Sequence, residues 1–214
     1  NVTFEWNKAV TEINGNKVRS GNQLREADQV FVCSGADFET LYPEIFDATP
    51  ITKCKLQMMR LATQPENWRI GPPLCAGLSF IHYKGFHVAP SLAKLKQVYE
   101  EQFPDLLDLG IHVMVSQNGN GQLTIGDSHE YGRHLDPFDR EDINKKITDF
   151  LKTFAAFKDW TLESSWHGIY PKMTDGATEF IHQASPQVWI VNGMGGAGMT
   201  LSFGLGEEVV EKIS

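Results

Sequence analysis

The sequence predicts a fold of α/β to α+β class with a large antiparallel part. Asn14-Gly15 and residues 118–121 (NGNG) are hairpin signals that lie between apolar runs. Two other apolar runs, residues 29–33 and 188–191, each end in a glycine turn that precedes a predicted helix. Since 41% of the 214 residues are hydrophobic, the chain can bury a substantial core, which excludes intrinsic disorder.

The beginning of the chain is expected to form strands and one short helix. Residues 2–13 are predicted as a strand that ends at the Asn14-Gly15 turn. Residues 29–33 (QVFVC) form the next strand, and residues 36–42 are predicted as a helix after its glycine turn. This order of strand, glycine turn and helix is typical of a ligand-binding sheet edge.

Two further strands are predicted before the middle of the chain. Residues 53–61 (KCKLQMMRL) are long enough to cross a sheet, with Lys53, Lys55 and Gln57 on one face. Residues 77–83 are predicted as a shorter strand.

The second half contains the clearest helix and hairpin patterns. Ser91 is expected to cap a helix that stops at Pro104, and Asp139 to cap a helix with an apolar stripe. The stripe comprises Ile143, Ile147, Phe150, Leu151 and Phe154. The predicted hairpin consists of residues 111–116 and 123–125, and a closing helix runs to Ile213.

Composition narrows the class of function. A formal net charge of −8 argues against an electrostatic grip on nucleic acid, and no apolar run is long enough for a membrane span. The first residues lack the pattern of a signal peptide. Cys33, Cys54 and Cys75 are too few and too scattered for a disulfide framework, so they are expected to be small core residues. We therefore expect a cytoplasmic location.

The glycine cluster from Gly193 to Gly198 matches G-x-G-x-x-G literally. A dinucleotide-binding fingerprint also needs a following βαβ unit and an acidic residue about 20 positions on, and too few residues follow Gly198 here. A flexible turn is one alternative. The other is a helix N-terminus whose free N–H groups attract negative charge. Together with Ser34-Gly35, this turn is expected to reach a common ligand in one sheet.

Five stretches of the chain carry a resemblance to a known family. They are residues 27–37, 54–58, 123–132, 166–171 and 193–206. In this order they resemble the C-terminal portion of FAD-dependent oxidoreductases of the D-amino-acid oxidase and sarcosine/glycine oxidase superfamily. More narrowly, the chain is similar to the bacterial branch associated with phosphonate (aminoethylphosphonate) catabolism.

The resemblance implies a two-domain FAD-dependent oxidase fold. Residues 1–48 would be a remnant of the FAD-binding domain, residues 49–165 the β-rich substrate-binding domain with helices, and residues 166–214 the return to the FAD-binding domain. The N-terminal GxGxxG unit that holds the FAD pyrophosphate has no counterpart in the sequence. The missing N-terminal part of the same protein is therefore an expected partner.

The resemblance also implies a set of site residues. The expected catalytic residues are Lys55, His129 and Tyr170, and no metal ligand is expected. Those expected to bind FAD are Val10, Ser34, Gly35, Ala36, Gly168, Gly195, Gly196, Gly198, Met199 and Thr200. Those expected to line the substrate are Gln57, His82, Tyr131 and His167.

At Tyr170 the family often has an arginine that binds a substrate carboxylate, so the tyrosine argues against an α-carboxylate substrate. The implied substrate is a small amine, amino acid or aminophosphonate. The implied reaction transfers a hydride from its amine-bearing carbon to flavin N5. If the substrate carries an anionic group other than a carboxylate, the cationic side chains available to bind it are Lys53, Lys55, Arg133, His167 and Lys172.

Two other classes of function remain open. The first is a non-catalytic substrate-domain module that does not retain FAD. The second is a metal-dependent hydrolase that uses His129 with His134, whose spacing differs from the HExxH pattern. His82 and His87 are interpreted as cavity-lining residues or, more simply, as hydrogen-bonded histidines of a sheet.

Overall fold

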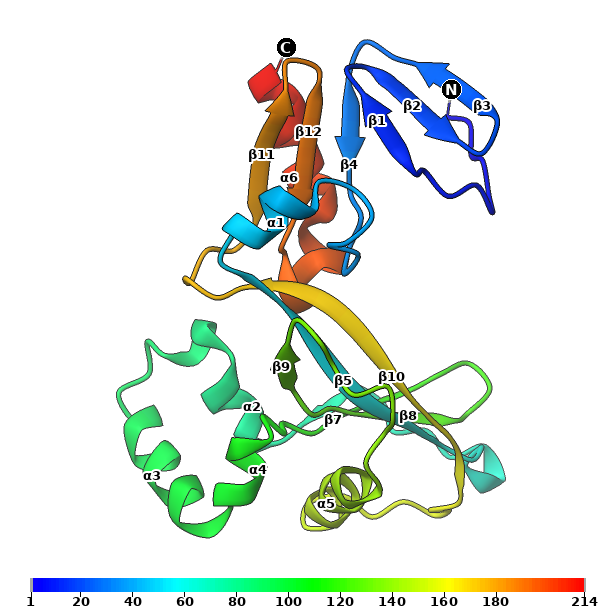
Figure 1. The fold of residues 1–214 in the computed structure, drawn as a ribbon. Helices are drawn as coiled ribbons and strands as arrows, with labels where there is room; N and C mark the ends of the chain where they lie inside the picture. The colour runs from blue at the N-terminus through cyan, green and yellow to red at the C-terminus, as the bar shows by residue number, and fades with distance from the viewer. Residues whose placement is uncertain (1, 214) are drawn as a thin grey trace. The chain divides into compact units, whose positions relative to one another are not determined.

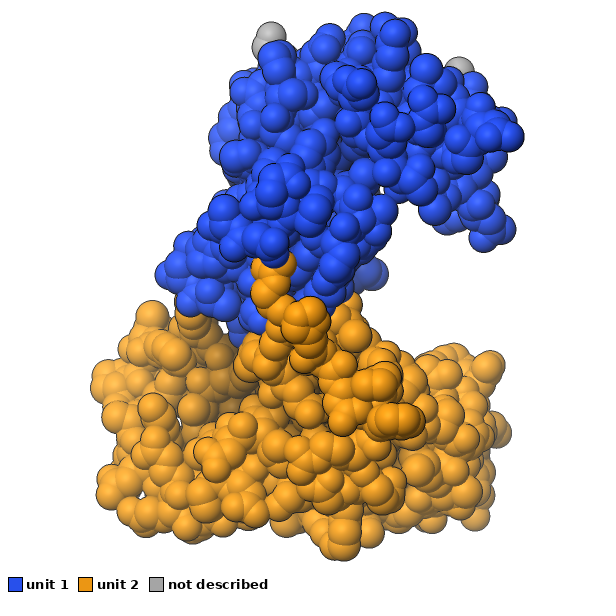
Figure 2. Space-filling model, in the orientation of Figure 1, with its two compact units in different colours: residues 1–53, 170–214 blue, residues 54–169 orange. Residues whose placement is uncertain are grey.

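The computed structural model describes residues 2–213, which divide into two compact units. Unit 1 comprises residues 1–53 and 170–214, and unit 2 comprises residues 54–169 (Figures 1 and 2). The chain passes between the units a few residues later than the predicted segment boundaries at 48 and 165. Whether the units act as separate functional domains stays a prediction.

Unit 1 contains two three-stranded sheets. The first is antiparallel and consists of β1 (Glu12–Asn14), β2 (Lys17–Ser20) and β3 (Gln23–Glu26). The second has the order β11-β12-β4, with bounds Phe180–Ser185, Val188–Asn192 and Val30–Val32. Its β11 and β12 are antiparallel, whereas β12 and β4 are parallel (Figure 1). The helices of unit 1 are α1 (Pro43–Ala48), the short η3 (Gly195–Ala197) and α6 (Gly198–Ile213).

The core of unit 1 lies on the second sheet. Phe38 and Phe46 stack with their ring centroids 4.8 Å apart, and both are fully buried. Val188 and Ile190 of β12 belong to the same cluster. Their burial fixes the register of the central strand β12 between its two neighbours.

Unit 2 is built on a six-stranded sheet of order β10-β5-β8-β7-β6, with β9 also paired to β5. The strands are β5 (Ile51–Leu61), β6 (Leu74–Cys75), β7 (Met114–Gln117), β8 (Leu123–Gly126), β9 (Glu130–Gly132) and β10 (Leu162–Met173). The helices are η1 (Pro65–Asn67), α2 (Gly77–His82), η2 (Lys84–Phe86), α3 (Leu92–Gln102), α4 (Pro104–Asp108) and α5 (Glu141–Leu151).

The predicted hairpin and the predicted α5 helix are confirmed. β7 and β8 pair antiparallel around residues 118–121. In α5, Ile143, Ile147 and Leu151 are fully buried against Met59 and Leu61 of β5. Phe154 is the exception, because it lies beyond the end of the helix and is exposed.

Several predicted elements are wrong, for local reasons. Residues 2–13 were predicted as one strand, but only Glu12 and Ile13 among them belong to a strand, β1. Residues 36–42 form a turn rather than a helix, because Asp37 Oδ1 accepts the N–H groups of Glu39 and Thr40. The helix there is α1, which starts at Pro43.

Residues 77–83 are the third error. The segment is the helix α2, not a strand, since a short apolar run does not distinguish the two by its period. His82 and His87 therefore do not belong to a sheet.

The predicted caps and the predicted burial of two cysteines also differ from the structure. Ser91 occupies the N-cap position of α3 but makes no side-chain cap hydrogen bond. The N-cap of α5 is Arg140, whereas Asp139 contacts Lys55 and His167. Cys33 and Cys75 are exposed, and only Cys54 is buried. Of the helices in residues 2–213, none combines the length and apolar character needed to cross a bilayer.

Candidate functional site

The two glycine turns meet at one edge of the second sheet of unit 1. β4 and β12 are parallel neighbours, so the turns that follow them, Ser34-Gly35 and the turn at Gly193, leave the sheet at the same edge. Asn192 joins the turns: its Nδ2 donates to Gly35 O at 3.0 Å, and its Oδ1 accepts the N–H of Gly193 at 2.7 Å. The predicted meeting of the turns is confirmed.

Asn192 is the residue that sequence reasoning missed. It is buried and closes the apolar run of β12, where an amide is costly unless it is hydrogen-bonded. A polar residue between a buried strand and a glycine cluster was the available signal. Its partner Gly35 is 157 positions away, so the bond itself could not be seen in the sequence.

The edge formed by these turns has open space and an unsatisfied polar atom. Gly35 has φ +60°, and no atom of the described residues would lie within 4 Å of a Cβ there. Ser34 Oγ is buried and has no hydrogen-bond partner within residues 2–213. A buried hydroxyl needs a partner, and a phosphate or ribityl oxygen would supply one. These residues fit the pyrophosphate and ribityl region of FAD.

The Gly193 turn leads into the N-terminus of α6 through η3. A Cβ at Gly195 would meet only Lys172 Cγ at 3.8 Å and Tyr170 Cε2 at 4.0 Å, among the described atoms. Gly196 is similarly open, with Tyr170 Oη at 3.7 Å. Helix N-termini carry partial positive charge, so this turn suits an electron-rich group.

The other predicted FAD contacts are scattered over both units. Ala36 follows the first turn, and Met199 and Thr200 are exposed in the first turn of α6. Val10 precedes β1, and Gly168 lies in β10 within unit 2. Their contacts with FAD stay predictions.

Lys55 of β5 is 1% exposed and its ammonium is surrounded by acceptors. Its Nζ donates to Asp136 O at 2.9 Å and to Phe138 O, and lies 3.4 Å from Asp139 Oδ1. His167 Nδ1 is 2.7 Å from the same carboxylate oxygen. These contacts fix the segment before α5, and the predicted catalytic role of Lys55 stays a prediction.

Gln57 lies on the same face of β5 and holds the start of α5. Its side chain accepts the N–H of Arg140 at 2.7 Å and donates to Asn144 Oδ1 at 3.0 Å. Of the predicted substrate contacts, Gln57 is thus buried in internal hydrogen bonds, whereas Tyr131 is exposed, with its ring centroid 6.1 Å from that of His129.

His129 lies next to His82 and His112 rather than His134. The three imidazoles each present a nitrogen within 4.8 Å of the others. Asp127 stands beside them, with Oδ1 3.3 Å from His112 Nε2. Burial raises the pKa of the Asp127 carboxyl to about 7. Unit 2 therefore holds a compact group of titratable side chains.

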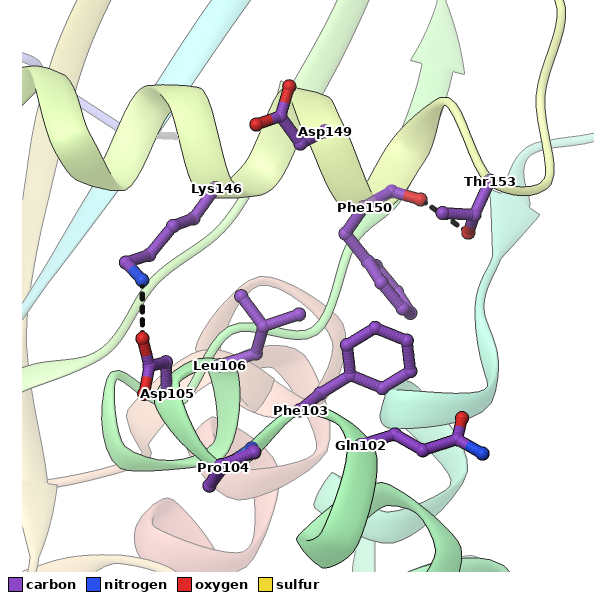
Figure 3. A pocket seen from close by; sticks show the side chains of 9 residues that line it. All are labelled: Gln102, Phe103, Pro104, Asp105, Leu106, Lys146, Asp149, Phe150 and Thr153. Atoms are coloured by element: carbon purple, nitrogen blue, oxygen red, sulfur yellow. Dashed lines mark hydrogen bonds and ion pairs between the residues drawn. The ribbon is translucent and has the colours of Figure 1, made fainter.

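A hollow of about 510 Å³ opens elsewhere in unit 2, between α4 and α5. Its lining includes Phe103, Leu106 and Phe150, and a 2.8 Å ion pair joins Lys146 to Asp105 across it (Figure 3). No predicted site residue lines this hollow. Its size alone does not make it a site, and two of its polar side chains, Lys146 and Asp105, are already paired with each other.

Comparison with known proteins defines the class of protein. The sequence profile of the family described as "FAD dependent oxidoreductase" (DAO) matches residues 1–212. The chain belongs to this family, whose cofactor is FAD. No curated protein matches the chain in sequence.

Solved structures show the same fold at low sequence identity. Glycine oxidase from Geobacillus kaustophilus is 14% identical, with a TM-score of 0.60 over 96% of this chain and 48% of that one. L-proline dehydrogenase from P. horikoshii is 18% identical, with a TM-score of 0.61 over 97% and 49%. Iminodiacetate oxidase from Chelativorans sp. BNC1 is 15% identical, with a TM-score of 0.58 over 91% and 46%. The chain spans about half the length of each.

Proposed function

We propose that the protein to which this chain belongs oxidises a C–N bond of a small amine or amino acid, with FAD as the electron acceptor. The observation that carries the proposal is the pair of glycine turns joined by Asn192, with the unsatisfied Ser34 Oγ beside them. Family membership supports it. The names of the similar structures, glycine oxidase, L-proline dehydrogenase and iminodiacetate oxidase, point to the same kind of bond.

In this proposal, each of the two glycine turns of unit 1 has a defined role in binding the cofactor. Ser34 Oγ would bind the pyrophosphate or ribityl part of the cofactor, and Gly35 would let the backbone approach it. Gly195, Gly196 and the N-terminus of α6 would stabilise negative charge on the flavin ring. When bound, FAD supplies the hydride acceptor, flavin N5, for oxidation of the amine to an imine.

The proposed substrate class is an amine without a recognised α-carboxylate, and an aminophosphonate is the finer candidate. Tyr170 offers one hydroxyl where a carboxylate-binding arginine would offer a charged fork. A cation with spare capacity exists on β5: Arg60 has its guanidinium carbon 5.2 Å from the ring centroid of Trp166. Its buried Nε has no hydrogen-bond partner in residues 2–213. Arg60 is thus a candidate for binding the substrate's anionic group.

The proposed partner is the rest of the FAD-binding domain. Helix α6 is largely apolar, yet Met199 and Phe203 are 92% and 88% exposed, and Val209 is its one buried residue. Exposed apolar patches of this kind mark interaction surfaces. An N-terminal nucleotide-binding segment of the same protein, packed on this helix, would cover them.

The same exposure favours a second candidate function for the 214-residue chain alone: a substrate-domain module that does not retain FAD. Half of a nucleotide site holds its ligand weakly, because the contacts of the other half are absent. The two candidates differ in one measurable quantity, the affinity of the chain for FAD.

The test is a titration of the purified chain with FAD, followed by quenching of flavin fluorescence. Binding by the chain, weakened at least about tenfold by Ser34→Ala, supports the cofactor site. Ser185→Ala is the matched control, because Ser185 Oγ in β11 is also buried without a partner in the described chain. Equal weakening by both variants, or by neither, would overturn the assignment of Ser34.

Determining the substrate class requires the whole parent protein. Reduction of an artificial electron acceptor is measured with glycine, N-methylglycine and N-methyl-2-aminoethylphosphonate. Preference for the phosphonate, with KM raised by Arg60→Leu, supports the finer proposal. Preference for the carboxylates would contradict it while leaving FAD-dependent amine oxidation in place.

A further inference from the structure

Three histidines from separate parts of unit 2 converge on one point. His82 ends α2, His112 precedes β7, and His129 lies between β8 and β9. Their ring centroids are 4.0 Å apart for His82 and His112, 4.7 Å for His82 and His129, and 5.0 Å for His112 and His129. One nitrogen from each ring lies within 4.8 Å of the other two. Separate elements of unit 2 thus bring three possible nitrogen ligands together.

The surrounding groups orient two of these rings. His129 Nδ1 is 2.9 Å from Gly110 O, a carbonyl that can only accept, so Nδ1 donates this hydrogen bond. His112 has Ser79 Oγ 3.5 Å from Nδ1 and Asp127 Oδ1 3.3 Å from Nε2. A carbonyl or carboxylate behind an imidazole is the usual second layer of a histidine metal site.

The cluster is largely withdrawn from solvent and is accessible at one of its three rings. His112 is 2% exposed and His129 is 6% exposed, whereas His82 is partly accessible. A metal ion bound by the three rings would enter past His82.

We propose that His82, His112 and His129 bind one divalent transition-metal ion of the zinc and cobalt class. Three imidazole ligands with a fourth, open position are a known arrangement for Zn²⁺, and nitrogen ligands disfavour Mg²⁺ and Ca²⁺. Asp127 positions His112 in this arrangement. The site uses no residue of the glycine turns, so it does not depend on the proposed cofactor site.

The structure differs here from the pairing that the sequence suggested. His134 is exposed and is not a member of the cluster, although it is five positions from His129. Since His134→Ala removes an imidazole from the same segment without touching the cluster, it is the matched control for His82→Ala.

The experiment is a titration of the metal-free 214-residue chain with Co²⁺, followed in the visible spectrum, and a competition with Zn²⁺. We expect one Co²⁺ per chain, with the intense visible bands of a four-coordinate site, and displacement by one Zn²⁺. His82→Ala should weaken Zn²⁺ binding at least about 100-fold and Asp127→Asn about 10- to 100-fold. His134→Ala should leave the affinity unchanged.

Each contrary result overturns the proposal. His82→Ala changes a partly accessible residue at the end of a helix, and circular dichroism establishes that the variant is folded. If that variant is unfolded, Asp127→Asn replaces it as the test. Absence of stoichiometric binding, or equal affinity of a folded His82→Ala variant and the unchanged chain, rules the site out. The proposal is also ruled out if the chain binds inorganic phosphate but not Co²⁺, and if His82→Ala abolishes the phosphate binding. The cluster would then be an anion site.

Discussion

The two units form their candidate sites in different ways. In unit 1 the site is made of backbone: two glycine turns, a helix N-terminus, and one side chain, Asn192, that holds the turns together. In unit 2 the polar groups are side chains that project from β5 and from the segments around β7 and β8, among them Lys55 and His129. A backbone site tolerates changes of side chain as long as glycine and the linking amide remain. A side-chain site fails when a single group is lost.

The difference predicts where each unit is sensitive. Substitutions in unit 2 should act by leaving buried polar or charged groups without partners. Substitutions in unit 1 should act by moving the backbone, with smaller effects on stability and larger effects on FAD binding. The following variants test this contrast.

The largest effect is expected for Lys55→Met in unit 2. The change removes a buried ammonium and leaves Asp136 O and Phe138 O without their donor, while Asp139 loses a cation. Loss of one partner from such a group costs about 3 to 5 kcal/mol. Urea denaturation measures the free energy of unfolding.

Lys145→Met is the control for Lys55→Met, because Lys145 is an exposed member of an ion pair with Asp149, worth at most about 1 kcal/mol. If Lys55→Met keeps the stability of the chain but abolishes amine oxidation by the parent protein, the predicted catalytic role of Lys55 is supported instead.

A smaller effect is expected for Asn192→Ala in unit 1. Gly193 N loses its partner in a buried place and Gly35 O loses its partner in a half-buried one, which together cost about 1 to 3 kcal/mol. Because the two turns are no longer joined, FAD affinity should fall more than tenfold. Gln183→Ala on the exposed face of β11 should change neither quantity. Unchanged FAD affinity in Asn192→Ala would separate the turns from the cofactor.

Gly35→Ala tests the backbone of the first turn by itself. At φ +60° an alanine is strained, and since no described atom would contact its Cβ, the cost is conformational, about 1 kcal/mol. Gly85→Ala in η2 also has open space but no positive φ, so it should be neutral or slightly stabilising. Thermal melts of both variants measure the difference, and equal melting temperatures would contradict the argument.

The comparison also explains what the sequence could predict. Local patterns were sufficient for α5, whose stripe has a helical period, for the hairpin at residues 118–121, and for the two glycine turns. The meeting of the turns followed from one general rule about sheets. Asn192 was missed because its partner Gly35 is its neighbour only after β4 and β12 pair in parallel.

The histidine cluster shows what local sequence patterns could not predict. His82, His112 and His129 are far apart in the sequence and become neighbours only through the packing of α2 beside the β7-β8 hairpin. Local spacing instead suggested His129 with His134, which the structure leaves outside the cluster. Interpreting residues 77–83 as a strand also placed His82 on the wrong kind of element.

The smallest effect on the chain alone is expected for Phe203→Ser on α6. The ring is 88% exposed, so its loss should change the free energy of unfolding of the 214-residue chain by less than about 0.5 kcal/mol. In the parent protein the same ring would be buried against the proposed FAD-binding segment, and its loss there should cost about 3 to 5 kcal/mol. Denaturation of both forms measures the two values. Glu207→Ser on the same helix, which replaces an exposed charge, should be silent in both. If Phe203→Ser is silent in the parent as well, α6 does not face the proposed FAD-binding segment, and the exposed apolar helix needs another partner.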